Sequence, residues 1–506
     1  GEYSVSISYK PSSLEKYKEA NKTVKLTITL PYTISADGTE ISNYSGLSKN
    51  VTLPTEYKSK QITSIANGTF SDKGIETIKF PIKSFEINPD VFVGCDTITT
   101  FYISTNTVFL DGAYPNGVDL VYYDNPTSIK NNQFGVATGI ETIEIPQSVK
   151  MIEQESLSKI GAKTLVLPSH LPLDKVLLSD EIKTIKVYNS KSGNDLPDSF
   201  FKNCTTVEKI VVEQGLQTFG DRIFENCTSL DELIIHSSVQ SVGKDIFLNC
   251  NVKKMEYNLS FSLQNVGLPE TLKEIIIIGE MIEIPSYAFY ECEYIEKIVL
   301  PNAVEEIGIY AFYGCKNLVD ITIPPQLNIV GHYAFAKCFL LSEIILPDTV
   351  SAILDGAFSE CTSLTNLVLP SGLTQISINT FLGCVSLETI NIPDGVQTIG
   401  DSAFASCRLL KEVVLPKNLK SIGLFAFELC VNLKEIAISR SVNLIGEHVF
   451  LRCDKLTKVL ILSETMPTIN GNIFSDLSQD CNVFVPNDLL AYYNSEYPEV
   501  NFIGIT

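Results

Sequence analysis

The apolar residues of the chain recur in a fixed order, which is clearest in the segment that begins at Leu318. Ile321 and Ile323 alternate with Thr322, and Pro324 follows directly. This alternation is typical of a half-buried strand, and proline ends the strand because it has no N–H to donate. An Ile-Gly type pair and the segment Ala-Phe-x-x-Cys, which ends at Cys338, come next with apolar residues at mixed spacings. We interpret this second half as a short extended or turn segment that closes one coil.

The same order returns every 23 residues along much of the chain. The first apolar strand position recurs in eight equal steps at Ile275, Ile298, Ile321, Ile344, Leu367, Ile390, Val413, Ile436 and Val459. Looser copies occur at Ile78, Phe101, Leu120, Ile143, Leu165, Ile185, Ile210, Leu233 and Met255, and Val483 adds a last one. One repeat cannot bury its apolar residues without stacked neighbours, so a fixed period of this length indicates a solenoid. The pattern predicts one β-rich solenoid of about 19 coils, instead of the roughly three domains that the length alone suggests.

The N-terminal end departs from this repeat. Residues 1–60 lack it, and they contain an alternating strand at Thr23–Leu30 and a plausible hairpin turn at Asp37-Gly38. Because the first coil of a solenoid exposes its core, we expect residues 1–60 to form a β cap over it. The predicted solenoid spans residues 61–486, irregular over 96–200 and regular over 201–460.

The C-terminal end is predicted to form a second cap, over residues 487–506. Val483 to Pro486 reads as the last strand of the solenoid. Asn487 is expected to be the N-cap of a short helix from Asp488 to about Asn494, because its side chain can accept a hydrogen bond from a free helix N–H.

The cysteines follow the same period. Twelve of the 13 lie three residues after a Phe, at Cys95, Cys204, Cys227, Cys250, Cys292, Cys315, Cys338, Cys361, Cys384, Cys407, Cys430 and Cys453. The alternatives are disulfides between coils, a metal–thiolate stack, or buried free thiols that pack as small hydrophobes. Disulfides would leave unpaired cysteines, and no Cys-x₂₋₄-Cys zinc knuckle occurs, so we favour buried free thiols. Cys481 is out of phase and is expected to be exposed or unpaired.

The Phe and Cys residues of six consecutive coils are assigned to the repeat core. They are Phe312, Cys315, Phe335, Cys338, Phe358, Cys361, Phe381, Cys384, Phe404, Cys407, Phe427 and Cys430. Large aromatic side chains beside small thiols at a fixed interval would stack in register when the coils stack.

Two sets of residues are candidates for binding a partner. The middle residue of each strand points away from the core and is often apolar, as at Val211, Ile234, Ile276, Val299, Ile345, Val368, Val414 and Leu460. Tyr287, Tyr310 and Tyr333 recur in phase, with Tyr290 and Tyr313 nearby. An apolar stripe or a stack of tyrosines favours partner contact. The alternatives are plain β-propensity for the strand residues and repeat packing for the tyrosines. Thr322, Asn391 and Ala437 interrupt the stripe.

Charge and motifs exclude several functions. The 506 residues include 38 basic and 59 acidic side chains, and a formal net charge of −21 argues against nucleic-acid binding, which needs a basic surface. No apolar run approaches the ~18 residues that span a bilayer, so no transmembrane segment is expected. The chain starts at Gly1, which suggests a trimmed or engineered start. The sequence shows no recognisable nucleophile, zinc-protease, phosphate-loop or calcium-loop motif. We expect no enzyme activity, no cofactor and no metal.

The repeat resembles the BspA-like (Treponema pallidum type) leucine-rich repeat family. That family has a 23-residue unit with Ile-x-Ile-Pro, Ile-Gly, Ala-Phe and Cys in this order. The resemblance covers about residues 61–486 and is strongest over 285–460, where seven copies agree in phase. It implies a curved leucine-rich-repeat solenoid. Residues 96–200 depart from the pattern, since their coils are irregular and lack Cys, and ligand specificity could lie there.

What the resemblance implies about function is a non-catalytic binding protein, secreted or at the cell surface. Members of the family are mostly extracellular, and several are implicated in adhesion to host matrix proteins and cells or in coaggregation. The expected partner is a host extracellular-matrix or cell-surface protein, or the surface of another microbe. The alternative is a spacer or stalk that displays another functional region and has no ligand of its own. An intracellular scaffold would suit free thiols but not the usual location of the family.

Overall fold

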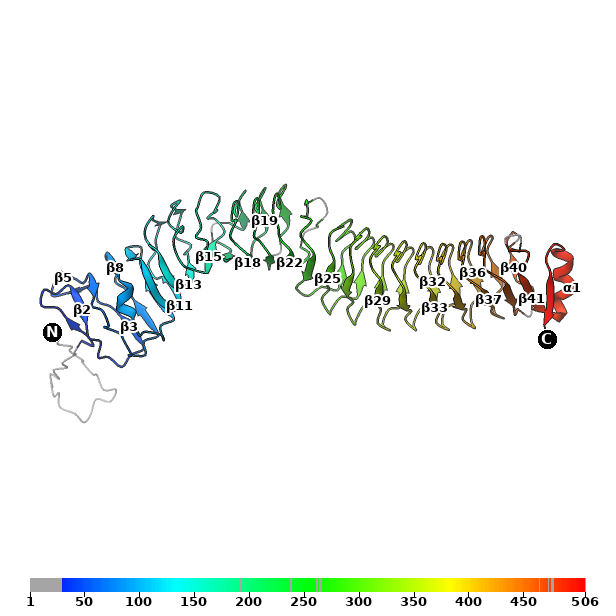
Figure 1. Ribbon diagram of the computed structural model, residues 1–506, viewed down its shortest axis with the longest axis horizontal. Coiled ribbons are helices and arrows are strands. Elements are labelled where there is room, and N and C mark those ends of the chain that lie inside the picture. Colours follow the sequence, from blue (N-terminus) through cyan, green and yellow to red (C-terminus); the bar gives the residue numbers. More distant parts are fainter. Residues whose placement is uncertain are drawn as a thin grey trace, which may run out of the picture. The chain divides into compact units, whose positions relative to one another are not determined.

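The computed structural model describes residues 30–505, except 192, 237–238, 261–262, 264–265, 464, 472 and 475–476 (Figure 1). The chain divides into two compact units: residues 1–171 with 175–185 form unit 1, and residues 172–174 with 186–506 form unit 2. The fold is a parallel β-solenoid with about 23 residues per turn, which confirms the predicted fold class. Apart from Leu30, the strand predicted at Thr23–Leu30 lies outside the described residues.

Unit 1 contains a parallel sheet in the order β3-β7-β9-β11-β13-β15. Cross-strand pairing aligns Val51, Ile78, Phe101, Leu120, Ile143 and Leu165 in one row. The last five are the strand positions predicted from the sequence, so their register is confirmed. Val51 on β3 adds a strand before residue 61, inside the segment assigned to the cap. The sheet strands are β3 (Asn50–Thr52), β7 (Thr77–Lys79), β9 (Thr100–Ile103), β11 (Gly112–Tyr122), β13 (Ala137–Glu144) and β15 (Thr164–Pro168).

Shorter elements complete unit 1. β1 pairs antiparallel with β2, and the turn between them contains Asp37 and Gly38, which confirms the predicted hairpin. Gly38 has a φ of +80°, a conformation that glycine adopts without strain. These elements are β1 (Thr33–Ile34), β2 (Glu40–Ser42), β4 (Glu56–Tyr57), β5 (Lys60–Gln61), β6 (Ser64–Ile65), β8 (Phe85–Ile87), the 3₁₀ helix η1 (Pro89–Phe92), β10 (Thr107–Phe109), β12 (Ser128–Ile129) and β14 (Met151–Ile152).

Unit 2 carries the regular part of the repeat. Its main strands pair in parallel and align the first apolar positions, for example Ile210, Leu233, Met255, Ile275, Ile298 and Ile321. The strands are β18 (Lys209–Val212), β20 (Glu232–Ile235), β22 (Lys254–Tyr257), β23 (Glu274–Ile277), β25 (Lys297–Val299), β27 (Asp320–Thr322), β29 (Glu343–Ile345), β31 (Asn366–Val368), β33 (Thr389–Asn391), β35 (Glu412–Val414), β37 (Glu435–Ile438) and β39 (Lys458–Ile461). β16 (Thr184–Tyr188) contains residues of both units.

In the coils of unit 2 that keep the second half of the repeat, this half contributes a two-residue parallel strand, which confirms the predicted extended or turn segment. These strands are β17 (Asp195–Leu196), β19 (Thr218–Phe219), β21 (Ser241–Val242), β24 (Glu283–Ile284), β26 (Glu306–Ile307), β28 (Ile329–Val330), β30 (Ala352–Ile353), β32 (Gln375–Ile376), β34 (Thr398–Ile399), β36 (Ser421–Ile422), β38 (Leu444–Ile445) and β40 (Thr468–Ile469). Each coil therefore has a strand side and a turn side.

The core of unit 2 is a stack of Phe rings beside a row of thiols. From Phe289 to Phe450 the rings of neighbouring coils lie 5.1–6.3 Å apart, centroid to centroid, and within 17° of parallel. From Cys315 to Cys453 each thiol donates to the Phe carbonyl of the preceding coil at 3.1–3.3 Å. Each aromatic pair adds about 0.5–1.5 kcal/mol of stabilisation beyond that from its burial. The stack therefore favours coils that are in exact register.

All 13 cysteines are buried and free. Burial raises the pKa of the Cys361 thiol to about 12, so the thiol stays protonated at neutral pH. Of the two alternatives for Cys481, exposed or unpaired, the second is confirmed: its thiol is free, but the residue is buried just before β41 and is only 6% exposed.

The C-terminal end consists of β41 (Asn482–Pro486), α1 (Asn487–Glu496) and β42 (Phe502–Ile505). α1 starts one residue earlier and ends two residues later than expected. The prediction of an Asn487 N-cap is wrong: Pro486 holds that position, and no side chain caps the helix. β42 was not foreseen; it pairs in parallel with β41. Tyr493 on α1 is fully buried and packs against Phe474 and Phe502, so α1 and β42 cover aromatic core at this end.

Candidate functional site

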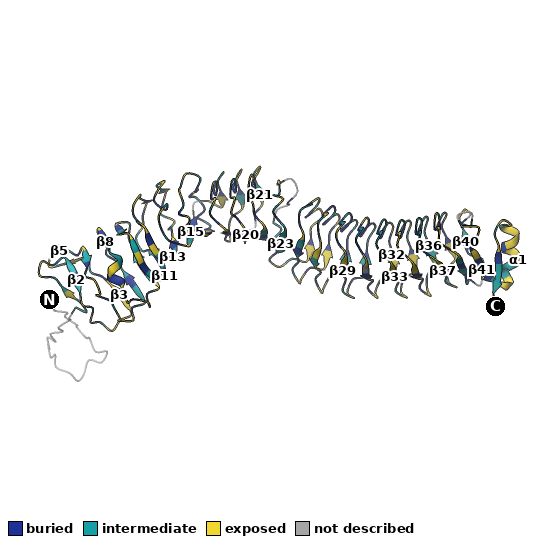
Figure 2. Cartoon of the chain, in the orientation of Figure 1, coloured by how far each residue is buried: buried dark blue, intermediate teal, exposed yellow. Residues whose placement is uncertain are grey.

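The middle residues of the strands in unit 2 form a column on the strand side. Ile345, Val368 and Val414 are 74%, 79% and 66% exposed, and we call these three residues the apolar stripe (Figure 2). Thr322, Asn391 and Ala437, also exposed, interrupt the column as the sequence indicated. The other candidates, Ile234, Ile276, Val299 and Leu460, are half-buried.

Val211 does not belong to this exposed column. It is only 6% exposed, and it lies in register beside Ile234 on β20. Lys209 lies two residues earlier on the same face of β18, and its ammonium group reaches Glu232 on β20 at 2.6 Å. The long side chains of this pair extend beside Val211, so the expectation that Val211 lines an exposed stripe is wrong.

Ion pairs line the column over β18–β27. The first strand position alternates between basic and acidic residues at Lys209, Glu232, Lys254, Glu274, Lys297 and Asp320. Lys254 Nζ lies 3.4 Å from a Glu232 carboxylate oxygen, and Lys297 Nζ lies 3.6 Å from Glu274. The hydrogen bond from Lys209 holds the pKa of Glu232 below its usual value. We call this set the ion-pair ladder; its aliphatic stems lie beside the half-buried middle residues.

A hollow of about 770 Å³ lies over β35, β37 and β39. Val414, Ala437 and Leu460 contribute the middle residues of these strands to its lining. Charged side chains of both signs surround them, at Glu412, Glu435, Lys458, Lys417 and Arg440. An apolar floor with a charged rim is the usual anatomy of a protein-binding surface.

Five tyrosines form an array on the turn side. Tyr287, Tyr310 and Tyr333 stack with centroids 5.3 Å apart, at 24° and 7°. Tyr290 and Tyr313 form a second stack at 5.2 Å and 8°. Tyr310 meets Tyr313 edge to face at 5.3 Å and 79°. We call these five residues the tyrosine array; the structure brings together all five tyrosines that the sequence singled out.

The backbone of the first stack is strained. Tyr287, Tyr310 and Tyr333 have φ values of 61°, 54° and 52°, in the left-handed region that bulky residues avoid. The next two coils carry Gly356 and Asn379 at this position, with φ of 64° and 57°. The left-handed turn is therefore a property of the coil, and tyrosine there costs on the order of 1 kcal/mol. Stacking offsets this cost, but the coil itself does not require the rings.

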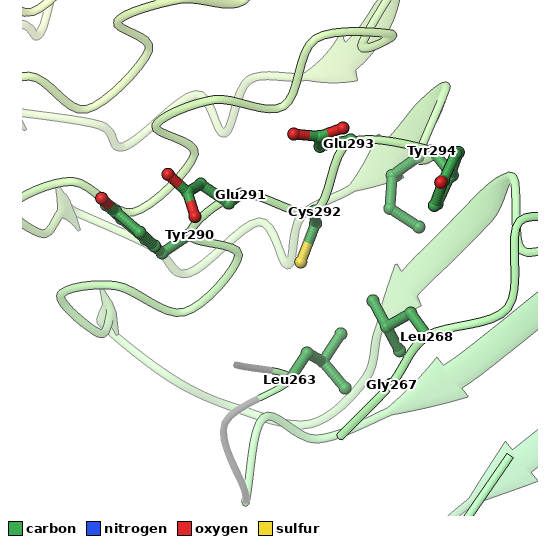
Figure 3. Close-up of a pocket in the computed structure, with 9 residues that line it drawn as sticks. Leu263, Gly267, Leu268, Tyr290, Glu291, Cys292, Glu293 and Tyr294 are labelled. Carbon is green, nitrogen blue, oxygen red and sulfur yellow. The ribbon is translucent and has the colours of Figure 1, made fainter. Parts of the chain in front are cut away.

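A second hollow, of about 350 Å³, lies where the repeat is interrupted (Figure 3). The coil over residues 253–279 lacks the Phe-x-x-Cys half, and the hollow lies between its Gly267-Leu268 segment and the turn Tyr290 to Ile295 of the next coil. Cys292 lies between two glutamates on this turn, and burial raises the pKa of its thiol to about 12. Sequence reasoning did not identify this hollow, although the missing half-repeat was its signal.

Within the described residues, no group of three or more His, Cys, Asp or Glu side chains is placed to hold a metal ion. A search of the same residues finds no helix that is both long and apolar enough to cross a membrane.

Several solved structures are similar to the chain. A leucine-rich repeat protein of Treponema pallidum is 29% identical, over 36% of this chain and 77% of that one, with a TM-score of 0.30. One from Bacteroides ovatus is 19% identical, over 95% and 99%, with a TM-score of 0.44. A leucine-rich cell surface protein of Faecalibacterium prausnitzii is 18% identical, over 78% and 95%, with a TM-score of 0.24. No curated protein matches the chain.

The repeat itself matches a family model. The BspA type leucine-rich repeat region matches in six copies, over residues 7–120, 114–187, 194–268, 282–411 and 397–497. These segments include far more than half of the chain, and they contain most of the strands described above. The chain therefore belongs to the BspA-type leucine-rich repeat family.

Proposed function

We propose that this chain is a non-catalytic binding protein of the cell surface or extracellular space that contacts protein partners through its strand side. The observation that carries the proposal is the apolar stripe, in which three large aliphatic side chains are each at least 66% exposed. Exposed aliphatic residues clustered on a regular face are unfavourable in water and are typical of surfaces that a partner covers. Leucine-rich repeat proteins generally bind proteins, and the partner proposed here is a host matrix or cell-surface protein or another microbe's surface.

The stripe and the hollow over β35–β39 share Val414, so they form one candidate surface. Its apolar residues would supply contact area, and the surrounding Lys, Arg and Glu side chains would select and orient the partner. The net charge of −21 biases long-range attraction toward basic or neutral partners. The tyrosine array is proposed as a second contact surface, because stacked tyrosines offer rigid amphipathic area.

The experiment measures binding of the purified chain to a panel of extracellular-matrix proteins and to intact epithelial cells. The test variant is Ile345→Glu/Val368→Glu/Val414→Glu, which should lower the affinity at least tenfold because three charges enter the contact. The matched control is Leu340→Glu/Ile378→Glu/Leu409→Glu, which changes three exposed aliphatic residues outside the apolar stripe and the hollow over β35–β39 by the same charge. The control should bind like the unmodified chain.

Two results would overturn this proposal. Saturable binding that both triple variants retain equally would place the contact elsewhere. A complete lack of saturable binding across the panel would favour the alternative, a spacer that displays another functional region without a ligand of its own.

A further inference from the structure

The hollow beside Tyr290 combines features that suit a positively charged organic group (Figure 3). Tyr290 and Tyr294 place two aromatic rings at its wall, and Glu291 and Glu293 place two carboxylates between them along the chain. Gly267 lies opposite with φ +66°, and a Cβ built there would meet nothing within 4 Å. The hollow therefore has open space next to rings and negative charge.

The two faces of the Tyr290 ring have different surroundings. One face stacks on Tyr313 of the following coil, with centroids 5.2 Å apart and planes within 8°. Tyr290 also lines the hollow, together with Gly267 and Leu268 of the preceding coil, and its ring meets that of Tyr287 at 5.6 Å and 53°. A ring face attracts cations because its π-electrons carry partial negative charge.

The opposite end of the same stack already holds a cation. The ammonium group of Lys337 lies 5.2 Å from the centroid of the Tyr313 ring, and Tyr290 stacks on that ring from the other side. The hydrogen bond with the Tyr313 hydroxyl, followed by the charge of that group, raises the Lys337 pKa. At the other end of this stack, Tyr290 offers the same kind of ring and lines the hollow.

The acidic side chains reinforce this preference. Glu291 is exposed and lies next to Tyr290. The pKa of the Tyr290 phenol is raised first by its own desolvation and second by the charge of Glu291. Glu293 is paired with Lys316 at 2.5 Å, which leaves Glu291 as the carboxylate on this turn with the greater exposure. Tyr294 donates to Glu270 at 3.1 Å, so a third carboxylate lies beside the second ring.

The coil does not need Tyr290 for its own packing. The equivalent residues of later coils are Ala336 and Ser359, each between the core Phe and the turn before the core Cys. Those coils keep the same Phe stack and thiol hydrogen bonds. The aromatic ring at this position is shared by the coil that borders the hollow, with Tyr290, and the next coil, with Tyr313.

We propose that this hollow, the Tyr290 pocket, binds an organic cation, supplied by a Lys or Arg side chain of a protein partner. The inference deepens the proposed binding role by naming the ligand chemistry of one site. It does not depend on the strand side, because the pocket is formed by turns.

Calorimetric titration tests the proposal with two probes, a hexalysine peptide and tetramethylammonium chloride, against a sodium chloride blank. Both probes should give saturable heats. Tyr290→Ala should weaken both at least tenfold, and Tyr290→Phe should retain them because the ring face is kept. Glu291→Gln should lower the affinity for hexalysine at least threefold. Because Glu291 is exposed, this variant should fold normally, so it tests the site even if Tyr290→Ala does not fold. Tyr492→Ala, on exposed α1, is the control and should change nothing.

Hexalysine binding that is equal in all variants would show general attraction to the acidic chain and would overturn the proposal. The absence of saturable heat for both probes would also overturn it. Binding of tetramethylammonium without hexalysine would overturn the assignment to a side chain and leave a free organic cation as the ligand. The Ile345→Glu/Val368→Glu/Val414→Glu variant should bind hexalysine normally, so failure of the strand-side proposal is measured separately.

Discussion

The first residue of the main strands differs between two stretches of unit 2. Over β18–β27 it alternates between Lys and Glu or Asp. Over β29–β39 this position includes Glu343, Thr389, Glu412 and Glu435, and the one lysine, Lys458, pairs with Glu435. The middle residues differ accordingly. Ile276 and Val299 are half-buried beside the ion-pair ladder, while Val368 is 79% exposed. Both stretches belong to unit 2, and their coils have the same repeat except the coil over residues 253–279, which is shorter and lacks the Phe-x-x-Cys half.

The difference teaches that the neighbours of an apolar residue on this face, and not its own type, decide how far it is exposed to solvent. Surface ion pairs contribute only about 0–1 kcal/mol each, so the ladder is a poor source of stability. Because its Lys and Glu side chains lie on the same face of the strands as the middle residues, their aliphatic stems can shield those residues from water. Where short or like-charged residues replace them, as at Thr389 and Glu412, the middle residues Asn391 and Val414 are exposed.

The largest expected effect comes from one charge placed at the same strand position in each stretch. Val211→Glu buries a charge beside Ile234, so the free energy of unfolding should fall on the order of 3 kcal/mol. Val368→Glu leaves the charge in water, and stability should change by less than about 0.5 kcal/mol. Urea unfolding followed by circular dichroism measures both. Equal losses would show that burial at these two positions does not differ.

A smaller effect is expected from pH. The pKa of Glu232 is lowered from 4.5 in the folded chain, mainly by Lys209, so its contribution to stability is present above the ordinary Glu pKa and is lost as the pH falls through the folded value. The unmodified chain should therefore lose more stability between pH 6 and pH 3 than Glu232→Gln. Glu343→Gln, at the same strand position on β29, is the control. If both variants give the same acid profile, the ladder does not contribute.

The smallest effect is expected from extending the ladder. Thr389 is the register partner of Glu412, so Thr389→Lys would add the pairing that Lys458 makes with Glu435. Stability should change by less than about 0.5 kcal/mol, but the stem should cover part of the column and lower the fluorescence of the apolar dye ANS. Thr389→Ser is the control. Unchanged dye binding in the lysine variant would contradict the covering role of the stems.

Much of the fold could be predicted because its information is local and repeated. Ile275 to Val459 recur at 23 residues, and the register of the strands follows that spacing. The Phe and Cys positions likewise lie in the core, because an apolar residue repeated in every coil meets its own copy in the next. The tyrosine array followed from the same spacing.

Single features at the ends and interruptions were harder to foresee. Pro486 replaces Asn487 as the N-cap because the strand before α1 decides where the helix can start. β42 was missed because Phe502 to Ile505 is a short apolar run without a repeat to support it. The Tyr290 pocket arises because the preceding coil lacks its Phe-x-x-Cys half. The absence of this half from the sequence does not specify the shape of the hollow that results.

By itself, the sequence of this protein determined coil length, strand register and core composition, since these depend on periodic apolar positions that any stacked arrangement must bury. Only the tertiary structure decided which middle residues are exposed, for Val211 and Val368 are the same residue type at the same strand position. The physical reason is that exposure depends on the side chains of adjacent coils. Those neighbours lie about 23 residues away in sequence and only one strand spacing away in space.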